Sequence, residues 1–346
     1  MRRRSARTEG GIAALACALA LLAGLATRAV AHDDDPTRAR MLTLGPWPPA
    51  APAADDARRA AIALGEQLFF SPRLGEGAGV RCASCHEPWR RYTDGRPRAL
   101  GLAEGQRNTP TLLDVAQHRR FGWDGARDDL ANQALRPLAD PREMPAGAAH
   151  VAALLRGDGG FATRYAAAFG APPGVDDEAV LRDAGRALAA YVATLTSART
   201  PFDAWRDASA ADAAARPPSP AAARGLALFT GRGGCIACHA GPTFSDDGFH
   251  VSLIRSTGPD GRPDDGQAAF APNAFRTPGL RDVAATAPYM HDGSVASLCD
   301  ALRPHAAGQP AGLGIDDRRD LVAFLETLQS GPPPAVDAAG HDCTPG

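Results

Sequence analysis

Two short motifs in this sequence combine thiols with an imidazole at a fixed spacing. In each motif two cysteines are separated by two residues and followed directly by a histidine: Cys82, Cys85 and His86 in the first, and Cys235, Cys238 and His239 in the second. Thiols at this spacing can add to the vinyl groups of a haem, and the histidine can then bind its iron as an axial ligand. A disulfide, a thioredoxin-like redox pair and half of a zinc site use the same cysteine spacing. None of these three needs the adjacent histidine, so the sequence predicts two covalently bound c-type haems.

The N-terminal segment has the pattern of a secretory signal. Arginines at positions 2–4 precede an apolar stretch over residues 11–25, and Ala29, Val30 and Ala31 form an A-x-A cleavage site. The apolar stretch is shorter than the roughly 18–20 residues that span a membrane. We therefore expect residues 1–31 to be a cleaved signal peptide, with no membrane anchor in the mature chain. The predicted location is the periplasm, where disulfides persist.

Two cysteines, Cys299 and Cys343, lie outside both motifs and the predicted signal peptide. In an oxidising compartment they can form a disulfide, which would tie the C-terminal tail to the second domain. Two free thiols are the alternative.

Charge excludes few functions for this chain. The sequence has 37 basic residues, all of them arginine, and 39 acidic residues, which give a formal net charge of -2. Proteins that bind nucleic acid or anionic membranes through their field carry a basic excess. We therefore expect neither as a partner.

The length and an internal repeat indicate two domains. The runs GEQLF at residues 65–69 and GLALF at 225–229 each precede a C-x-x-C-H motif, and the motifs lie far apart in the chain. Residues 208–223 are rich in alanine and proline, which is typical of a linker. We predict an N-terminal domain over 32–207, this linker, and a C-terminal domain over 224–346.

Apolar periodicity predicts helices. Residues 57–70, 180–196 and 316–329 place their large apolar side chains on one helical face, and no comparable alternating pattern predicts strands. Gly- and Pro-bearing loops join these segments, as expected where a planar cofactor supplies much of the core. The predicted fold is all-α, with two cytochrome c-like domains that each hold one haem.

Several longer segments carry a family resemblance: LGEQLFFSPRL, CASCHEPWRRYTDGRP, RNTPTLLDV, GWDGARDDLANQALRPLADPREM and FRTPGLRDVAATAPYMHDGSVASL. In order and spacing they resemble the bacterial di-haem cytochrome c peroxidase and MauG family over nearly all of the mature chain. The resemblance implies a peroxide-reactive haem on His86 and an electron-transferring haem on His239. It also places Trp123 between the two haems.

The resemblance assigns the distal side of the reactive haem to Glu143 and Gln133. Glu143 matches the family's acid/base group, and Gln133 matches its hydrogen-bonding partner. Before the O–O bond of peroxide breaks, one oxygen must lose a proton and the other must gain one, which a carboxylate can carry across. Without the family, Glu143 would be interpreted as a solvated loop residue and Gln133 as an exposed helix residue.

A calcium site between the domains is also implied. Asn108 and the backbone carbonyls of Thr286 and Pro288 match the family's ligands, and oxygen ligands suit this cation. The alternative for Asn108 is a turn, because asparagine before Thr-Pro favours one.

The chain departs from many peroxidases of the family near Leu102, where those proteins carry a histidine that ligates the reactive iron at rest. No histidine occurs between His86 and His118. We therefore expect an open coordination position, as in MauG-like proteins. His118 is the nearest replacement, but it adjoins Arg119 and Arg120, so we expect it at the surface.

A second departure concerns the other haem. The position that holds methionine or tyrosine in the family falls on His305, which follows the helix-breaking Pro304. We therefore expect His239 and His305 to ligate this haem together, with a surface histidine as the alternative. Methionine ligation raises the haem potential, so bis-histidine ligation should lower it and favour the storage of an oxidising equivalent.

These features predict a periplasmic di-haem peroxidase that reduces H2O2 at the open N-terminal haem. Electrons would come through the C-terminal haem from a small cytochrome c or a cupredoxin. The alternatives are a MauG-like oxidase of a partner protein's side chains, a non-catalytic electron-transfer cytochrome, and a sensor that binds a small gas. The resemblance also suggests a homodimer.

Overall fold

The structure is a computed structural model that describes residues 36–47, 54–77, 79–212, 214–255, 272–310, 312–331 and 343. The predicted signal peptide, residues 1–31, lies outside the described residues. Within the described ranges, no helix combines the length and apolar character needed to cross a membrane.

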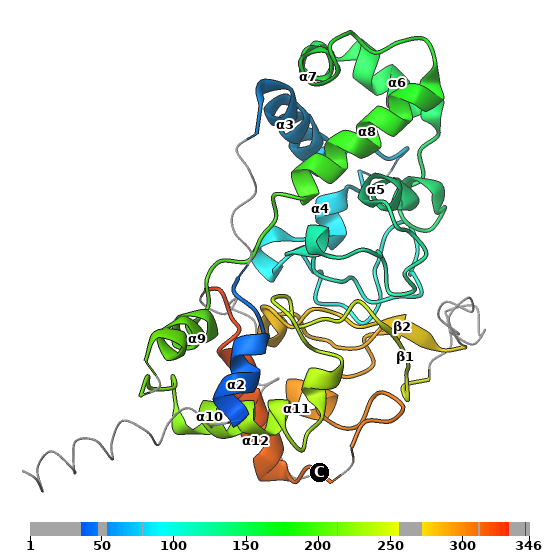
Figure 1. Ribbon diagram of the computed structural model, residues 1–346. Coiled ribbons are helices and arrows are strands. Elements are labelled where there is room, and N and C mark those ends of the chain that lie inside the picture. The colour runs from blue at the N-terminus through cyan, green and yellow to red at the C-terminus, as the bar shows by residue number, and fades with distance from the viewer. Residues whose placement is uncertain are drawn as a thin grey trace, which may run out of the picture.

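The described part of the chain is mostly helical (Figure 1). Its longer elements are α2 Pro36–Thr43, α3 Asp56–Phe70, α5 Leu130–Ala139, α6 Ala148–Gly157, α7 Gly159–Phe169, α8 Asp177–Val192, α9 Pro201–Ala211, α10 Pro220–Thr230 and α12 Ile315–Glu326. The short elements are α4 Cys82–Cys85, α11 Leu298–Ala301, β1 Phe249–Val251, β2 Ala274–Arg276 and the 3₁₀ turns η1 Pro88–Arg90, η2 Val115–Gln117, η3 Cys235–Ala237 and η4 Val283–Ala285.

The three predicted helices are present with small shifts at their ends, as α3, α8 and α12. The two strands were not expected. They pair antiparallel, with His250 opposite Phe275. Each strand has only three residues, which is too short for an alternating pattern to stand out in the sequence.

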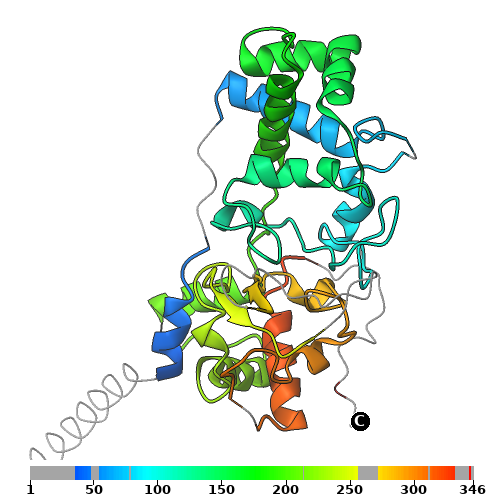
Figure 2. The ribbon, with the colours of Figure 1, turned by 90° about the vertical axis from the view of Figure 1, so that its right-hand side faces the viewer.

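The described residues form two separate hydrophobic clusters. The ribbon views show an upper and a lower unit, and each cluster is formed by elements of one of them (Figures 1 and 2). The first cluster packs side chains of α3, α6, α7 and α8 around Leu68 and Leu188. The second packs α10 and α12 around Phe229 and Phe324. Each unit therefore has an apolar core of its own.

The clusters do not follow the predicted domain boundaries. Met41 and Leu44, at the end of α2, and Phe202, in α9, belong to the second cluster although they precede residue 208. Both ribbon views place α2 beside the lower unit (Figures 1 and 2). The predicted linker is also partly helical, because α9 ends at Ala211 and α10 begins at Pro220. The boundary between the units depends on tertiary contacts of a few apolar residues. Such contacts cannot be inferred from the composition of the sequence.

The internal repeat is visible as two equivalent helix crossings. A Cβ on Gly65 of α3 would lie 1.9 Å from the carbonyl oxygen of Ala187 in α8. A Cβ on Gly225 of α10 would lie 2.0 Å from the carbonyl oxygen of Asp320 in α12. In each unit, the helix before the C-x-x-C-H motif thus approaches a later helix at a glycine.

In each unit a buried aspartate accepts two hydrogen bonds from a serine that lies far away in the sequence. Asp114 accepts hydrogen bonds from the backbone N and Oγ of Ser197, at 2.8 and 2.7 Å. Asp282 accepts the same pair from Ser330, at 2.9 and 2.7 Å. Both aspartates have left-handed backbone, with φ of 60° and 58°. The weak repeat in the sequence therefore reflects two units built on one plan.

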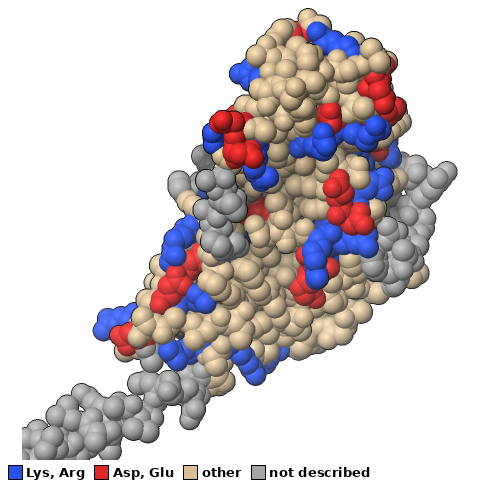
Figure 3. All heavy atoms as spheres, turned by 45° about the horizontal axis from the view of Figure 1, so that its top comes forward, with Lys and Arg blue, Asp and Glu red and all other residues tan. Residues whose placement is uncertain are grey.

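The remaining cysteines form a disulfide between Cys299 and Cys343, the preferred of the two sequence-based alternatives. It joins α11 to residue 343. Acidic and basic side chains lie close together on the face shown in Figure 3. Many acidic side chains of the described residues pair with an arginine, as Asp158 does with Arg73 at 2.7 Å.

We expect Gly65→Ala to destabilise the first unit by about 1–3 kcal/mol, because the added methyl would overlap the backbone of α8. Gly157→Ala is the matched control, since a Cβ there meets nothing within 4 Å. Urea unfolding of the haem-loaded protein measures both. Equal stability of the two variants would contradict the close crossing.

Candidate active site

A cavity of about 780 Å³ is lined by residues of both units. Every residue that the sequence analysis selects for a haem, a distal group or a cation contributes to its wall: Cys82, Cys85, His86, Asn108, Trp123, Gln133, Glu143, Cys235, Cys238, His239, Thr286, Pro288 and His305. The fold therefore brings the predicted site residues to one interior space, although they come from positions up to 223 residues apart in the chain.

The first motif forms α4, whose turn places His86 next to the cavity. The backbone N of His86 donates to the carbonyl of Cys82 at 2.9 Å. His86 Nδ1 lies 3.0 Å from the carbonyl oxygen of Tyr92. A carbonyl can only accept, so Nδ1 carries the hydrogen and Nε2 keeps its lone pair. Burial lowers the pKa of His86, which keeps the ring neutral. This is the form in which histidine binds a metal.

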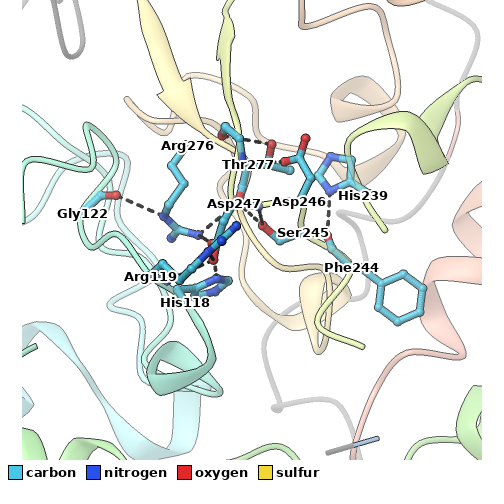
Figure 4. Close-up of polar contacts among 11 residues, drawn as sticks. His118, Arg119, Gly122, His239, Phe244, Ser245, Asp246, Asp247, Arg276 and Thr277 are labelled. Carbon is cyan, nitrogen blue, oxygen red and sulfur yellow. Dashed lines mark hydrogen bonds and ion pairs between the residues drawn. The ribbon is translucent and has the colours of Figure 1, made fainter. Parts of the chain in front are cut away.

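The second motif repeats this arrangement. The backbone N of His239 donates to the carbonyl of Cys235 at 2.8 Å, and Nδ1 lies 3.0 Å from the carbonyl oxygen of Phe244 (Figure 4). Burial lowers the pKa of His239 to about 4. The two carbonyls come from residues with the same left-handed backbone, because Tyr92 and Phe244 both have φ of 58°. Nε2 of each motif histidine is thus available for a metal.

The motif cysteines are suited to a thioether rather than to thiolate chemistry. Burial raises the pKa of Cys82 to about 12 and the pKa of Cys85 and Cys235 to about 11. Thiol–disulfide exchange requires the thiolate, which such values disfavour. Together with the neutral histidines, these residues fit covalently attached haem.

A second imidazole faces His239 across the cavity. The ring centroids of His239 and His305 are 6.5 Å apart. Two metal–nitrogen bonds of about 2.0–2.1 Å, each followed by about 1.1 Å to the ring centre, span roughly the same distance. His305 Nδ1 lies 3.1 Å from the carbonyl oxygen of Arg303, which again leaves Nε2 free of the hydrogen. The pair therefore fits two axial ligands of one metal.

A carboxylate stands near the first motif. Glu143 follows α5, and its side chain is 30% exposed, so it is not the fully solvated loop residue of the alternative interpretation. Burial raises the pKa of Glu143, while the positive charge of Arg136, whose Nη1 is 3.8 Å from Oε1, opposes that rise. The segment of Glu143 lies beside the first motif, because its carbonyl bonds Leu102 and the carbonyl oxygen of Leu100 is 3.9 Å from Sγ of Cys85.

Gln133 lies in α5, the helix that precedes Glu143. Its side-chain amide is within 4 Å of the position that a Cβ on Gly122 would take. Gly122 has a left-handed backbone and directly precedes Trp123. Gln133 therefore faces the loop that carries Trp123 rather than solvent.

The loop around Leu102 is held against the backbone of Glu143. The backbone N of Leu102 donates to the carbonyl of Glu143 at 3.1 Å, and that of Ala103 donates to the carbonyl of Arg142 at 2.9 Å. The Leu102 side chain points outward and is 44% exposed. In this described loop, the position where other members of the resembled family carry a histidine thus faces solvent.

The prediction that His118 lies at the surface is wrong. Its side chain is only 7% exposed, and Nδ1 lies 2.7 Å from Oδ1 of Asp247 (Figure 4). The neighbouring arginines are a misleading signal, because Arg119 is exposed while His118 turns inward to an acceptor that lies 129 residues away in the sequence.

Trp123 contacts both units. Its indole Nε1 donates to the carbonyl of Asn108 at 2.9 Å, and its own carbonyl accepts from the backbone N of Arg276 at 2.9 Å. Asn108 is buried, and its Nδ2 donates to the carbonyl of Arg96 at 2.8 Å. The backbone N of Asn108 donates to the carbonyl of His291 at 2.9 Å. The segment 108–123 is therefore bonded directly to the second unit.

Sequence reasoning did not select Asp246 and His250, which with Cys238 place one potential metal-ligating atom each within 4.8 Å of one another. His250 Nε2 is 2.9 Å from Oδ2 of Asp246. No signal in the sequence links these residues to the motif, because the loop after it folds back. Cys238 and His250 also line the cavity, and a Cys238 bound to haem would not be available to a second metal.

Comparison with known proteins decides the family. A family model described as di-haem cytochrome c peroxidase matches residues 59–211. The methylamine utilization protein MauG of Methylorubrum extorquens is 38% identical over 293 residues, which cover 78% of this chain and 78% of the relative. The chain belongs to the di-haem cytochrome c peroxidase and MauG family. This confirms the resemblance noted in the sequence.

Two further relatives support the same assignment. The cytochrome-c peroxidase IdrP1 of Denitromonas iodatirespirans is 33% identical over 368 residues, covering 92% of this chain and 94% of the relative. The crystal structure of the diheme peroxidase BthA from Burkholderia thailandensis superposes with a TM-score of 0.70 at 26% identity, covering 86% and 92%. The chain is thus a cytochrome-c peroxidase-type oxidoreductase of a family whose members bind two c-type haems.

We expect Arg136→Gln to shift the pH dependence of the reaction with peroxide. Removing this positive charge raises the pKa of Glu143, so its carboxylate form is lost at a higher pH. The acid limb of the rate profile, measured by stopped-flow absorbance, should therefore move to higher pH. Arg73→Gln is the control, because Arg73 pairs with Asp158 instead. An acid limb that stays in place or moves down would contradict the role of Glu143 as a base.

Proposed function

We propose that this protein is a periplasmic di-haem peroxidase that reduces H2O2 at a haem held by His86, with electrons supplied through a haem held by His239 and His305. One observation carries the proposal: the side chain that lies near the first motif is a carboxylate, and the one that lies near the second is an imidazole. A second imidazole stands 6.5 Å from His239, whereas a partly buried carboxylate, Glu143, stands near the first motif. The first site is thus equipped for proton transfer and the second for closed, two-histidine ligation.

When bound, the first haem supplies the iron to which peroxide binds, and the second supplies electrons. Glu143 would accept a proton from one oxygen of H2O2 and return it to the other, so that this oxygen leaves as water. Its partial burial supports this role, because a raised pKa brings a carboxyl group closer to the pH at which it must both accept and donate. Gln133, which faces the loop that carries Trp123, would orient the peroxide.

Trp123 is the proposed connection between the sites. Its side chain and its backbone are bonded to different units, which supports a position between them. The physiological electron donor in this proposal is a small cytochrome c or a cupredoxin of the periplasm.

A MauG-like oxidase is the second candidate function. It is favoured by His305, since nitrogen ligation in place of methionine lowers the haem potential and eases the storage of an oxidising equivalent. It is also supported by the relative named MauG, at 38% identity. In this case the electrons would come from the side chains of a partner protein. A non-catalytic electron carrier is less well supported, because it has no use for a carboxylate near the first motif.

The remaining assignments extend the proposal. Asn108, with the carbonyls of Thr286 and Pro288, would hold a calcium ion, which is supported by their shared position on the cavity wall. Export to the periplasm is supported by the Cys299–Cys343 disulfide, since disulfides persist in oxidising compartments.

Low-temperature EPR of the ferric protein tests the proposal before and after one equivalent of H2O2. We expect one high-spin and one low-spin signal, both lost on addition of peroxide. In Glu143→Gln the loss should be slower by about 10²–10⁴-fold. Glu104→Gln, which changes an exposed glutamate outside the cavity, is the control. Two low-spin signals that do not respond to peroxide would refute the proposal in favour of an electron carrier.

The ligand role of His305 has its own test. We expect His305→Met to keep the low-spin signal and to raise the reduction potential of the second haem by a measurable part of the roughly 0.8 V range that axial ligands cover. Spectroelectrochemical titration measures the change. An unchanged potential together with an unchanged EPR signal would show that His305 is not a ligand.

A further inference from the structure

Asp247 accepts hydrogen bonds from two segments that belong to different parts of the chain (Figure 4). Its Oδ1 lies 2.7 Å from Nδ1 of His118 and 3.5 Å from Nη1 of Arg276. Its Oδ2 accepts from the backbone N of Arg119 at 3.0 Å. We refer to these four residues as the Asp247 clamp.

The clamp is largely withdrawn from solvent. The side chains of His118, Asp247 and Arg276 are 7%, 12% and 10% exposed. Burial lowers the pKa of His118, while its hydrogen bond to Asp247 opposes the change, so the ring is neutral near pH 7 and donates from Nδ1. If a partly buried carboxylate loses one of its hydrogen-bond donors, its charge is left unsatisfied and the folded state is destabilised. We therefore expect Asp247 to keep its donors in this arrangement.

The clamp acts on the loop that carries Trp123. Arg276 donates its backbone N to the carbonyl of Trp123 at 2.9 Å, and its Nε lies 3.5 Å from the carbonyl oxygen of Gly122. His118, at the start of the same loop, is bonded to Asp247. The loop 118–123 is therefore attached to the second unit at both of its ends.

The same clamp reaches the second motif. Asp247 lies three residues after Phe244, whose carbonyl accepts the Nδ1 hydrogen of His239. The backbone N of Asp246 also donates to the carbonyl of Cys238 at 2.8 Å. One carboxylate thus joins the loop that positions Trp123 to the loop that positions His239.

We infer that Asp247 and His118 are positioning residues that hold Trp123 in a fixed place relative to the second haem site, and so set the rate at which the two haems exchange electrons. The inference rests on the proposed function, in which Trp123 lies between the haems. The rate of electron transfer through a side chain depends on its distance from donor and acceptor, so a displaced Trp123 would slow the exchange.

The test measures electron exchange between the haems without peroxide. Pulse-radiolytic reduction of the ferric, haem-loaded protein delivers one electron, and absorbance follows its equilibration between the two haems. We expect His118→Phe, Asp247→Asn and Trp123→Phe each to slow this equilibration about tenfold or more. His118→Asn should restore much of the rate, because its amide can donate from close to the position of Nδ1.

Asp320→Asn is the matched control. Asp320 also binds an arginine, Arg224, through two hydrogen bonds, and its side chain is 17% exposed, but Arg224 lies in α10 and not in the loop that carries Trp123. We expect its equilibration rate to equal that of the unmodified protein. EPR of each ferric variant should show unchanged haem signals, which a change of haem ligation would alter.

Several results would overturn the inference. They are an unchanged rate in His118→Phe and Asp247→Asn, an equal slowing in Asp320→Asn, an altered low-spin EPR signal in the slow variants, or no equilibration in the unmodified protein. If Asp247→Asn fails to fold, the pair His118→Phe and His118→Asn decides the question. Failure of the proposed function is distinguished by another result. In that case the haem signals would not respond to peroxide, while the rates of electron equilibration between the haems would be unaffected.

Discussion

The hydrogen bond from imidazole Nδ1 to a backbone carbonyl is the interaction on which both haem sites depend. Tyr92 supplies the carbonyl to His86 and Phe244 supplies it to His239, each at 3.0 Å. The bond fixes the hydrogen on Nδ1 and leaves Nε2 to the metal. It is made at some cost, since both carbonyl-bearing residues adopt a left-handed backbone that non-glycine residues avoid. Both units adopt this unfavourable conformation after their motif. The orientation of the imidazole is therefore more important to the fold than a relaxed loop backbone.

The two units share this interaction, a helix crossing at a glycine and a buried aspartate, but they differ in the side chains near their motifs. The glycine crossings at Gly65 and Gly225 and the buried aspartates are equivalent, so the scaffold is one plan used twice. Near its motif, one unit presents His305 and the other presents Glu143. A closed pair of imidazoles resists further ligands, whereas a partly buried carboxylate assists the proton transfer that peroxide requires. A repeated fold can thus divide a reaction between an electron store and a reactive centre.

What could be predicted from the sequence follows from how far apart the interacting residues are in the chain. The haem motifs are complete within five residues, and the helices α3, α8 and α12 show their own periodicity, so local reasoning found them. The family resemblance supplied Glu143 and His305, which no local pattern would have selected. The burial of His118 was missed because its acceptor is 129 residues away. The packing of α2 on the second unit was missed for the same reason, because a short apolar segment does not indicate which distant residues it packs against.

The junction between the units relies strongly on directional polar contacts. The described residues form two separate hydrophobic clusters, and Arg91 reaches from the loop after the first motif to Asp282 of the second unit, at 3.3 Å. The Asp247 clamp makes a second contact of this kind. Apolar surfaces gain nearly the same free energy over a range of relative positions, whereas charge-assisted hydrogen bonds lose strength when distance or angle changes. A junction with directional polar contacts therefore fixes the relative position of the two units more closely than apolar packing alone would.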